Sequence, residues 1–310
     1  MKPSALPRKR FSFGKIFKRD WQLWLLLSPI LIYIAIFEYL PMYGIQIAFR
    51  QYRAVHGIWG SEWVGLRHFE TFFSSFFWQR LFTNTILLNL YGLLWGFPVP
   101  IILALLLNRV DSKRFKKFTQ TSIFLPNFIS GVVVAGMMFL FLSPSNGFVN
   151  SIIMFFGGDP IFFMFSADWY RTIFIVRGIW QGAGWGAIIY LAALTSIDPE
   201  IYEAATIDGA TIMQKIRHID IPNIIPIAMM LLILNSGSML SSNTQMTILL
   251  QTPGNISTSD ILGMHVFRTG LEMGRFSYAA AVGLMTNVIN FAIILMVNAI
   301  TKKVSNIGLF

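Results

Sequence analysis

The stretch that decides the fold reads Asp198-Pro-Glu-Ile-Tyr-Glu-Ala-Ala-Thr-Ile-Asp-Gly-Ala210 and runs on to Ile219-Asp-Ile-Pro222. It is polar and helix-forming, and it lies between two apolar segments long enough to cross a membrane. A lipid-spanning chain has no structural need for such an insert between two spans. We therefore interpret residues 198–222 as a segment that engages another protein at the membrane surface.

The first half of this loop carries the signals of a short helix. Asp198 is a good N-cap, and Pro199 suits the first helical position. Glu200 follows in the first turn, where the helix dipole favours a negative charge. Gly209 is suited to end the helix, because glycine readily adopts the left-handed conformation found after helix C-termini. We predict a helix that begins at 199 or 200 and ends at Gly209.

The second half of the loop predicts another short helix. Thr211-Ile-Met-Gln214 has the spacing of a capping box, and the helix would run towards Arg217. Pro222 and Pro226 are expected to limit its continuation into the next span, because proline lacks the backbone donor that a helix interior needs. The prediction is two short helices joined at a glycine and lying across the membrane face.

This loop has the character of a docking surface. Ala204 and Ala205 remove bulk, so another surface can approach closely, while Glu203 and Asp208 offer carboxylates to arginine or backbone partners. A helix of this kind fits into a groove on a partner. The alternative is a capped interfacial helix whose charged face is merely solvated.

Composition points to lipid as the main solvent of the chain. Hydrophobic residues make up 55% of the 310 residues, charged residues only 12%, and the mean hydropathy is +0.61. Soluble domains have about 25% charged residues. The net charge of +10 could indicate nucleic acid, but the basic residues lie mostly at the ends of apolar segments, which favours topology signals and contact with anionic lipid.

Catalytic and metal chemistry finds little support in the sequence. The chain has no cysteine, which excludes a disulfide framework, a thiolate nucleophile and a cysteine-based metal site. Its four histidines show no metal-ligand spacing. We predict no catalytic residue and no metal site.

The hydropathy pattern predicts an all-α polytopic membrane protein with six transmembrane helices. Each apolar run is near twenty residues, which at about 1.5 Å per residue crosses a hydrocarbon core of about 30 Å. The fifth run is short, and we expect it to extend past Leu240. The six ranges are 21–47, 81–107, 118–142, 172–194, 224–240 and 277–300. They form one permease domain over 21–300, with the loop at 198–222 between the fourth and fifth spans.

The distribution of lysine and arginine sets the orientation. With a cytoplasmic N-terminus, sixteen basic residues fall inside and seven outside, and Arg177 lies within the fourth span. This bias places the basic tail 1–20, the loop 198–222 and the tail 301–310 in the cytoplasm. The first apolar run is too long for a signal peptide and shows no small-residue cleavage site, so we interpret it as a retained span.

Three segments are then expected on the outer face. Residues 48–80 carry aromatic and charged side chains and predict a short amphipathic element. Residues 147–158 are apolar but too short to span, which predicts an interfacial or re-entrant helix. Residues 241–276 are polar and contain a Pro253-Gly254 turn.

The loop closely resembles the EAA loop of binding-protein-dependent ABC importer permeases, of the maltose-type sugar family. Glu-Ala-Ala is followed by three residues, Gly, nine residues and Ile-x-x-Pro, and the Asp-Gly-Ala after it matches the sugar-transport branch. The branch commonly has Leu where Ile221 stands. By this resemblance the ATPase-coupling residues are Glu203, Ala204, Ala205, Asp208, Gly209, Ile219 and Pro222.

The resemblance covers nearly the whole chain and favours the branch that imports complex oligosaccharides and polysaccharide fragments. It is carried by Glu38-Tyr-Leu-Pro-Met-Tyr-Gly-Ile-Gln-Ile-Ala-Phe-Arg50, Val64-Gly-Leu-Arg-His-Phe69, Asn84-Thr85, Thr269-Gly270 and Ser277-Tyr-Ala-Ala-Ala-Val-Gly-Leu284.

The resemblance also implies a set of partners. These are a second, homologous permease in a heterodimer, two copies of an ABC ATPase and an extracytoplasmic solute-binding lipoprotein that delivers the carbohydrate. No Gly-x-x-x-x-Gly-Lys-Ser/Thr sequence occurs, so ATP and Mg²⁺ are expected on the partner ATPases and the chain itself is not an enzyme. The implied location is a bacterial plasma membrane, with membrane lipid and no nucleic acid as a partner.

Polar residues within the spans are candidates for a sugar passage. The resemblance favours Gly182, Trp185, Ser238, Met239 and Ser242, and polarity adds Asn127, Ser130, Trp180, Gln181, Asn235 and Ser236. Asn287, Asn290 and Asn298 fall within about 80° on a helical wheel and would share one face. The alternative for each is helix–helix packing, which small and polar residues often serve in membranes.

Two charged residues and two other function classes stay open. Arg177 and Glu38 are functional candidates as intramembrane charges, yet snorkelling or pairing explains them equally well. An ion-driven secondary transporter would need embedded titratable groups, and the spans offer few. A membrane enzyme would need a carboxylate or metal cluster, and none is evident.

Overall fold

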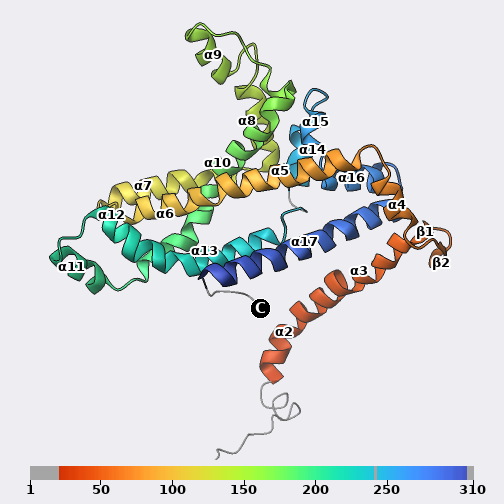
Figure 1. Ribbon diagram of the computed structural model, residues 1–310, viewed down its shortest axis with the longest axis horizontal. Coiled ribbons are helices and arrows are strands. Elements are labelled where there is room, and N and C mark those ends of the chain that lie inside the picture. Colours follow the sequence, from red (N-terminus) through yellow and green to blue (C-terminus); the bar gives the residue numbers. More distant parts are fainter. Residues whose placement is uncertain (1–20, 241–242, 306–310) are drawn as a thin grey trace, which may run out of the picture.

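Most helices run along one long axis of the protein (Figure 1). The computed structural model describes residues 21–240 and 243–305. One end carries α11 (Pro199–Ile207), and we call it the loop end; the other carries a two-stranded hairpin, and we call it the hairpin end. The long elements between them are α5 (Trp78–Gly96), α6 (Pro98–Asn108), α7 (Lys113–Phe124), α13 (Ile221–Ser236) and α17 (Phe276–Ser305).

Within the described residues, four continuous helices are long and apolar enough to cross a membrane. They are Trp21–Phe49, Trp78–Asn108, Ile212–Ser236 and Phe276–Lys303. A fifth results if the bent pair Lys113–Phe128 and Gly131–Phe141 counts as one span. The chain is therefore a predominantly helical membrane protein with four or five candidate spans.

The helix α10 (Ala167–Thr195) contains the predicted span 172–194 but is not among these candidates. It has 29 residues, enough to cross a bilayer. Its sequence includes Arg171, Arg177 and Gln181, which lower its mean hydropathy. Length alone therefore qualifies α10 as a span, and composition sets it apart from the other four.

The predicted third span, 118–142, is not one straight helix. α7 passes into a 3₁₀ turn, Leu125–Phe128, and α8 (Gly131–Phe141) leaves at an angle of 100°. The break follows from Pro126, which cannot donate to the helix ladder, and from Ser130, whose hydroxyl accepts a hydrogen bond from Val133 N at 3.4 Å and starts α8 afresh.

The all-α prediction needs one correction at the hairpin end. β1 (Arg50–Arg53) and β2 (Gly57–Trp63) pair antiparallel, with Arg50 opposite Trp63. The Arg50 guanidinium lies 5.4 Å from the ring centroids of both Trp59 and Trp63. α4 (Arg67–Phe73) follows the hairpin, so the segment predicted as one amphipathic element is a hairpin and a helix.

The first apolar segment forms an arm, Trp21–Phe49, that leaves the bundle (Figure 1). It comprises α2 (Trp21–Ile34), a π-helical turn (Ala35–Tyr39), α3 (Leu40–Met42) and a 3₁₀ helix (Tyr43–Phe49). None of its most apolar 18-residue window is buried, whereas 28% is buried in the last span.

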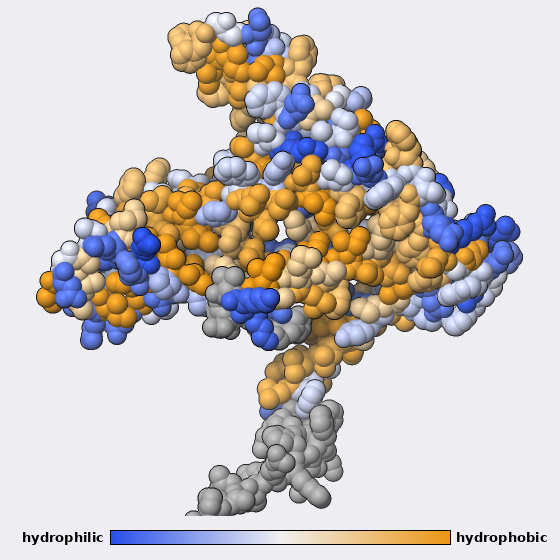
Figure 2. Space-filling view, viewed as in Figure 1, coloured by the Kyte–Doolittle hydropathy of each residue, from blue (hydrophilic) through white to orange (hydrophobic). Residues whose placement is uncertain are grey.

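Short helices complete the fold. α9 (Phe148–Phe155) projects from the bundle beyond α8, where residues 147–158 were predicted to form an interfacial helix, and its surface is strongly apolar (Figures 1 and 2). The remaining short elements are a 3₁₀ turn (Phe163–Phe165), α14 (Thr244–Leu250), α15 (Ile256–Ser259), α16 (Leu262–Phe267) and a π-helical turn (Arg268–Glu272).

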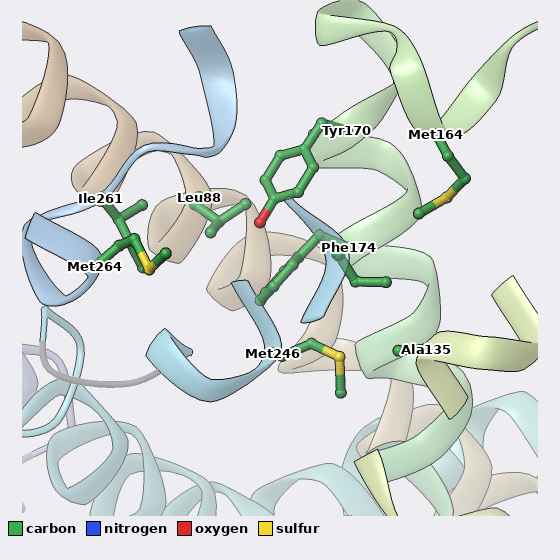
Figure 3. Close-up of a cluster of buried hydrophobic side chains, with 9 residues drawn as sticks. Leu88, Ala135, Met164, Tyr170, Phe174, Met246, Ile261 and Met264 are labelled. Carbon is green, nitrogen blue, oxygen red and sulfur yellow. The ribbon is translucent and has the colours of Figure 1, made fainter. Parts of the chain in front are cut away.

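Three buried clusters hold these elements together. In the middle of the molecule, Leu88, Tyr170, Phe174 and Met246 join α5, α10 and α14 (Figure 3). A second cluster near the loop end packs α6, α10 and α13, and a third near the hairpin end packs α4, α5 and α17. The helices thus have side-chain cores at both ends and in the middle.

Candidate functional site

The helix α11 has the limits that its sequence predicts. Asp198 Oδ1 accepts a hydrogen bond from Glu200 N at 3.0 Å, and Pro199 occupies the first turn. At the other end Gly209 has φ +75°, and Ala210 N donates to Ala205 O at 2.9 Å. This is the left-handed termination that only glycine adopts without strain.

The second helix of the loop does not stop where the sequence predicts. The capping box of α12 (Ile212–Lys215) forms, with Thr211 N donating to Gln214 Oε1 at 2.7 Å. The helix then continues through a π-helical turn, Ile216–Asp220, into α13. In that turn Ile221 N donates to Ile216 O, which adds one residue to the turn directly before Pro222. The prediction that Pro222 and Pro226 would break the helix is therefore wrong, and loop and span form one rod.

The predicted coupling residues divide into an outer and an inner set. Glu203, Ala204, Asp208 and Gly209 are exposed, and Ala205 is partly buried. Apolar side chains stand beside them on the surface: Ile201, Ile207, Ile212 and Met213 are 48%, 87%, 66% and 69% exposed. Ile219, in contrast, packs against the cluster of α6, α10 and α13. Pro222 is exposed at the start of α13.

A fully buried carboxylate ties this loop to two long helices. Asp220 is 0% exposed and accepts hydrogen bonds from the Arg109 guanidinium and from the Tyr202 hydroxyl, the latter at 2.6 Å. The Arg109 guanidinium also lies 5.2 Å from the centre of the Tyr202 ring. Tyr202 belongs to α11, Arg109 follows α6, and Asp220 precedes α13. We call these three residues the clamp.

Burial, together with the hydrogen bond to Asp220 and the negative charge of Asp220, raises the pKa of Tyr202 to about 12, although the nearby Arg109 charge lowers it. The phenol therefore keeps its proton and stays a donor throughout the physiological range. The sequence did not single out the clamp, because Arg109 counted there only as a topology charge. The one available signal was an acidic residue inside an otherwise apolar Ile-x-x-Pro stretch.

A cavity of about 450 Å³ lies between α5, α6, α10 and α13. Of the predicted passage residues, Gly182, Asn235, Ser236 and Met239 line it. Arg177, a candidate from the sequence because of its charge, also lines the cavity, and sequence reasoning missed three further polar members of the wall, namely Asn89, Tyr190 and Asn243. These lie on α5, on α10 and just before α14, so the cavity wall draws on segments far apart in the chain.

Other predicted passage residues do not line this cavity. Gln181 donates to Ile129 O at 2.9 Å and braces the break in the third segment. Trp185 is 52% exposed, and its ring meets that of Phe128 edge-on at 6.0 Å. Asn127 lies in the 3₁₀ turn before α8, and the Ser238 hydroxyl donates to Asn235 O at 3.5 Å. Trp180 lines a separate apolar cavity, and Ser242 lies outside the described residues.

The asparagines of the last span serve packing rather than this cavity. Asn290 is buried and its Oδ1 accepts from Leu240 N at 2.9 Å. Asn298 is also buried, but Asn287 is exposed, and none of the three lines the cavity. The shared face predicted from the helical wheel does not border this cavity.

These features, a helical membrane chain with a capped surface loop and a cavity among its long helices, fit the class of membrane permeases. Residues 96–306 match the family described as the inner membrane component of binding-protein-dependent transport systems. The chain belongs to this family. Its resemblance to importer permeases is thereby confirmed.

Similar proteins lie within the sugar-transporting part of the family. The chain is 41% identical to YteP of Bacillus subtilis (strain 168), the permease of a polygalacturonan/rhamnogalacturonan transport system, over 93% of this chain and 90% of that protein. It is 41% identical to LplB of the same organism, over 99% and 97%. Among solved structures, a bacterial alginate ABC transporter in complex with a periplasmic protein holding an alginate pentasaccharide contains a chain with 40% identity and a TM-score of 0.88, over 96% of this chain and 99% of that one.

Proposed function

We propose that this chain is the permease subunit of an ATP-driven importer that moves a carbohydrate, and specifically an oligosaccharide, into the cytoplasm. Support comes from the family membership and from relatives whose names assign them to polygalacturonan, rhamnogalacturonan and galactooligosaccharide transport. The site contributes a cavity lined by asparagine and serine, whose side chains pair with hydroxyl groups.

The proposed topology has six spans in a bacterial plasma membrane. It counts α10 and the bent pair of α7 and α8 as spans. Both termini and the loop 198–222 are then cytoplasmic, as the excess of lysine and arginine on that side favours. The loop end is the cytoplasmic end, and the hairpin end faces the solute-binding lipoprotein.

The observation that carries the coupling role is the clamp. The outer set Glu203 to Gly209 is presented to a partner, while Tyr202 on the same helix is fixed through Asp220 to α6 and α13. A push on α11 is therefore passed to two long helices that border the cavity. Closure of two partner ATPases on ATP and Mg²⁺ would tilt these helices and switch access from one side to the other.

A second, homologous permease is proposed from the arm Trp21–Phe49. Among the described residues, Glu38 of the arm is exposed and makes no hydrogen bond or ion pair. A lone carboxylate facing lipid is costly, so a partner surface has to supply its counter-group. The other half of a heterodimeric passage would also close the cavity, which is open on one side of this chain.

The test is coupling in a reconstituted complex. With the partner permease, the ATPases and the loaded lipoprotein, we expect ATP hydrolysis that the loaded lipoprotein stimulates, and none from this chain alone. Glu203→Lys and Gly209→Pro should lose most of that stimulation, because one reverses a charge on the docking face and the other removes the donor N–H and the left-handed turn after α11.

The matched control is Asp111→Lys, an exposed carboxylate between α6 and α7 that lies outside the loop 198–222. It should hydrolyse ATP as the wild type does. If the loaded lipoprotein stimulates ATP hydrolysis fully in both loop variants, residues 198–222 do not couple the permease to the ATPases. Sugar uptake without any ATPase would instead point to an ion-driven carrier.

A further inference from the structure

The wall of the cavity between α5, α6, α10 and α13 is mostly apolar, with a few polar side chains and almost no charge. Among the described residues of its wall, Arg177 is the single charged side chain. No aspartate or glutamate is among the wall residues in the described ranges 21–240 and 243–305. Its volume of about 450 Å³ falls in the range of about 300–1,000 Å³ that small-molecule sites occupy.

Arg177 has no ion-pair partner among the described residues. Its Nη1 donates to Gln181 Oε1 at 3.1 Å, and its guanidinium lies 4.9 Å from the centre of the Phe174 ring. Its Nε is buried without a hydrogen-bond partner. The described residues contain three ion pairs, and none of them includes Arg177. The guanidinium is thus positioned by an amide and a ring while its charge remains uncompensated.

An uncompensated arginine deep in a membrane protein is costly to keep. Arginine stays protonated throughout the accessible pH range, so it cannot relieve the cost by losing its charge. Three other arginines meet this cost with an acid, since Arg109 pairs with Asp220, and Arg80 and Arg268 pair with Asp260, whereas Arg171 is held, like Arg177, by an amide oxygen. Arg177 differs from Arg171 in that it lines the cavity, where a bound solute can supply the anion.

Resting on the importer function proposed above, we propose that the transported sugar is acidic and that Arg177 receives its carboxylate during passage. A guanidinium offers two parallel donors that match a carboxylate, and Gln181 and Phe174 hold it in place. The amides in the wall pair with sugar hydroxyls. The substrate class is then an oligosaccharide that contains uronic acid.

The experiment compares acidic sugars with their neutral counterparts. The complete complex, with its lipoprotein and with ATP inside the vesicles, is offered trimers of galacturonate and of mannuronate, each beside its methyl ester. The ester keeps length and linkage and removes only the charge. The readout is the ratio of acid uptake to ester uptake. Since the lipoprotein is the same in every variant, its own preference cancels when ratios are compared.

The wild type should favour one of the acids. Arg177→Gln should lower the acid-to-ester ratio by roughly tenfold, because hydrogen bonds to charged groups are the stronger ones. Arg177→Lys should retain part of the preference. The matched control is Arg171→Gln on the same helix: Arg171 donates to Asn84 Oδ1 at 2.8 Å and does not line the cavity, so the ratio should stay as in the wild type.

Two results would overturn the proposal. One is an acid-to-ester uptake ratio that does not change in Arg177→Gln. If this variant also releases the second permease, Arg177 pairs with that subunit and not with the substrate. The other is a wild-type complex that takes up neither acid, or takes acid and ester equally. If lipoprotein loaded with a neutral sugar still stimulates ATP hydrolysis, the proposed importer function is retained and only the proposal of an acidic substrate is rejected.

Discussion

Asp220 shows how much depends on one side chain in the clamp. It is fully buried, and its two oxygens accept from Arg109 and Tyr202. Removing only the acid leaves a partly buried guanidinium without its anion. We expect Asp220→Leu to lower the free energy of unfolding by about 3 kcal/mol, the scale typical of a buried ion pair that loses one member. Thermal unfolding of the purified complex in detergent measures this.

The double variant Arg109→Met with Asp220→Leu separates charge from packing. It replaces the pair by apolar groups, and it should recover most of the loss. Asp208→Asn, an exposed acid in the same loop, should change stability by less than about 0.5 kcal/mol. If the double variant is as unstable as Asp220→Leu, the ion pair is not what stabilises the loop.

His265 gives the molecule a pH dependence near the hairpin end. Burial lowers the pKa of His265 below its usual value, although nearby Asp260 raises it; Arg275 and Arg268 lower it. The unfolded chain therefore binds a proton at a higher pH than the folded chain. Stability is fully present above the ordinary histidine pKa of about 6.5 and decreases as the pH falls from there towards the lower folded-state pKa.

We accordingly expect a lower thermal midpoint at about pH 5.5 than at about pH 7.5. In His265→Gln the difference between these two midpoints should shrink, because the titrating group is gone. His56→Gln, an exposed histidine in the hairpin turn, is the control and should leave the difference as it is. A larger difference in His265→Gln would contradict the assigned direction.

At the scale of elements, a glycine sets how closely two helices approach. A Cβ added to Gly184 of α10 would lie 2.0 Å from Ile123 O in α7. Gly184→Ala must therefore push the helices apart, and overpacking of this kind costs typically about 1–3 kcal/mol. Gly178→Ala on the same helix meets nothing within 4 Å and should be neutral or slightly stabilising. Equal unfolding temperatures for both variants would contradict the close approach.

What the sequence predicts well at this scale is local. The cap at Asp198, the stop at Gly209 and the capping box at Thr211 all form, because each involves residues only a few positions apart. The π-helical turn before Pro222 was missed. A helix can accommodate a proline by adding one residue to the preceding turn, and no residue type in the sequence predicts this addition.

What the sequence could not supply is contact between distant segments. Asp220 and Arg109 are 111 positions apart, and nothing in either local pattern pairs them. Asn89 joins the cavity wall for the same reason. For Asn287, Asn290 and Asn298 the periodicity gives a common direction but not their contacts: Asn290 Oδ1 accepts from Leu240 N, whereas Asn287 is exposed.

At the scale of the whole molecule, the most apolar window of the arm Trp21–Phe49 is unburied, and the arm meets the rest of the described chain at its last turns, Tyr43–Phe49, which pack against α17 and the hairpin. Glu38 sits in its π-helical turn, exposed and unpaired among the described residues. If the second permease supplies the counter-group, Glu38→Gln should weaken the pair of permeases, and Glu38→Lys should weaken it further. Native mass spectrometry or size-exclusion chromatography in mild detergent would follow the heterodimer fraction.

The control for the arm is Glu62→Gln, an exposed acid on β2 at the hairpin end, which should leave the heterodimer intact. The arm variants should also keep their own fold, because the arm contributes little to the buried clusters. An unchanged heterodimer fraction in Glu38→Lys would place this carboxylate among lipid headgroups instead. The charge would then have no role in assembly, and apolar contacts alone would have to hold the arm against the second subunit.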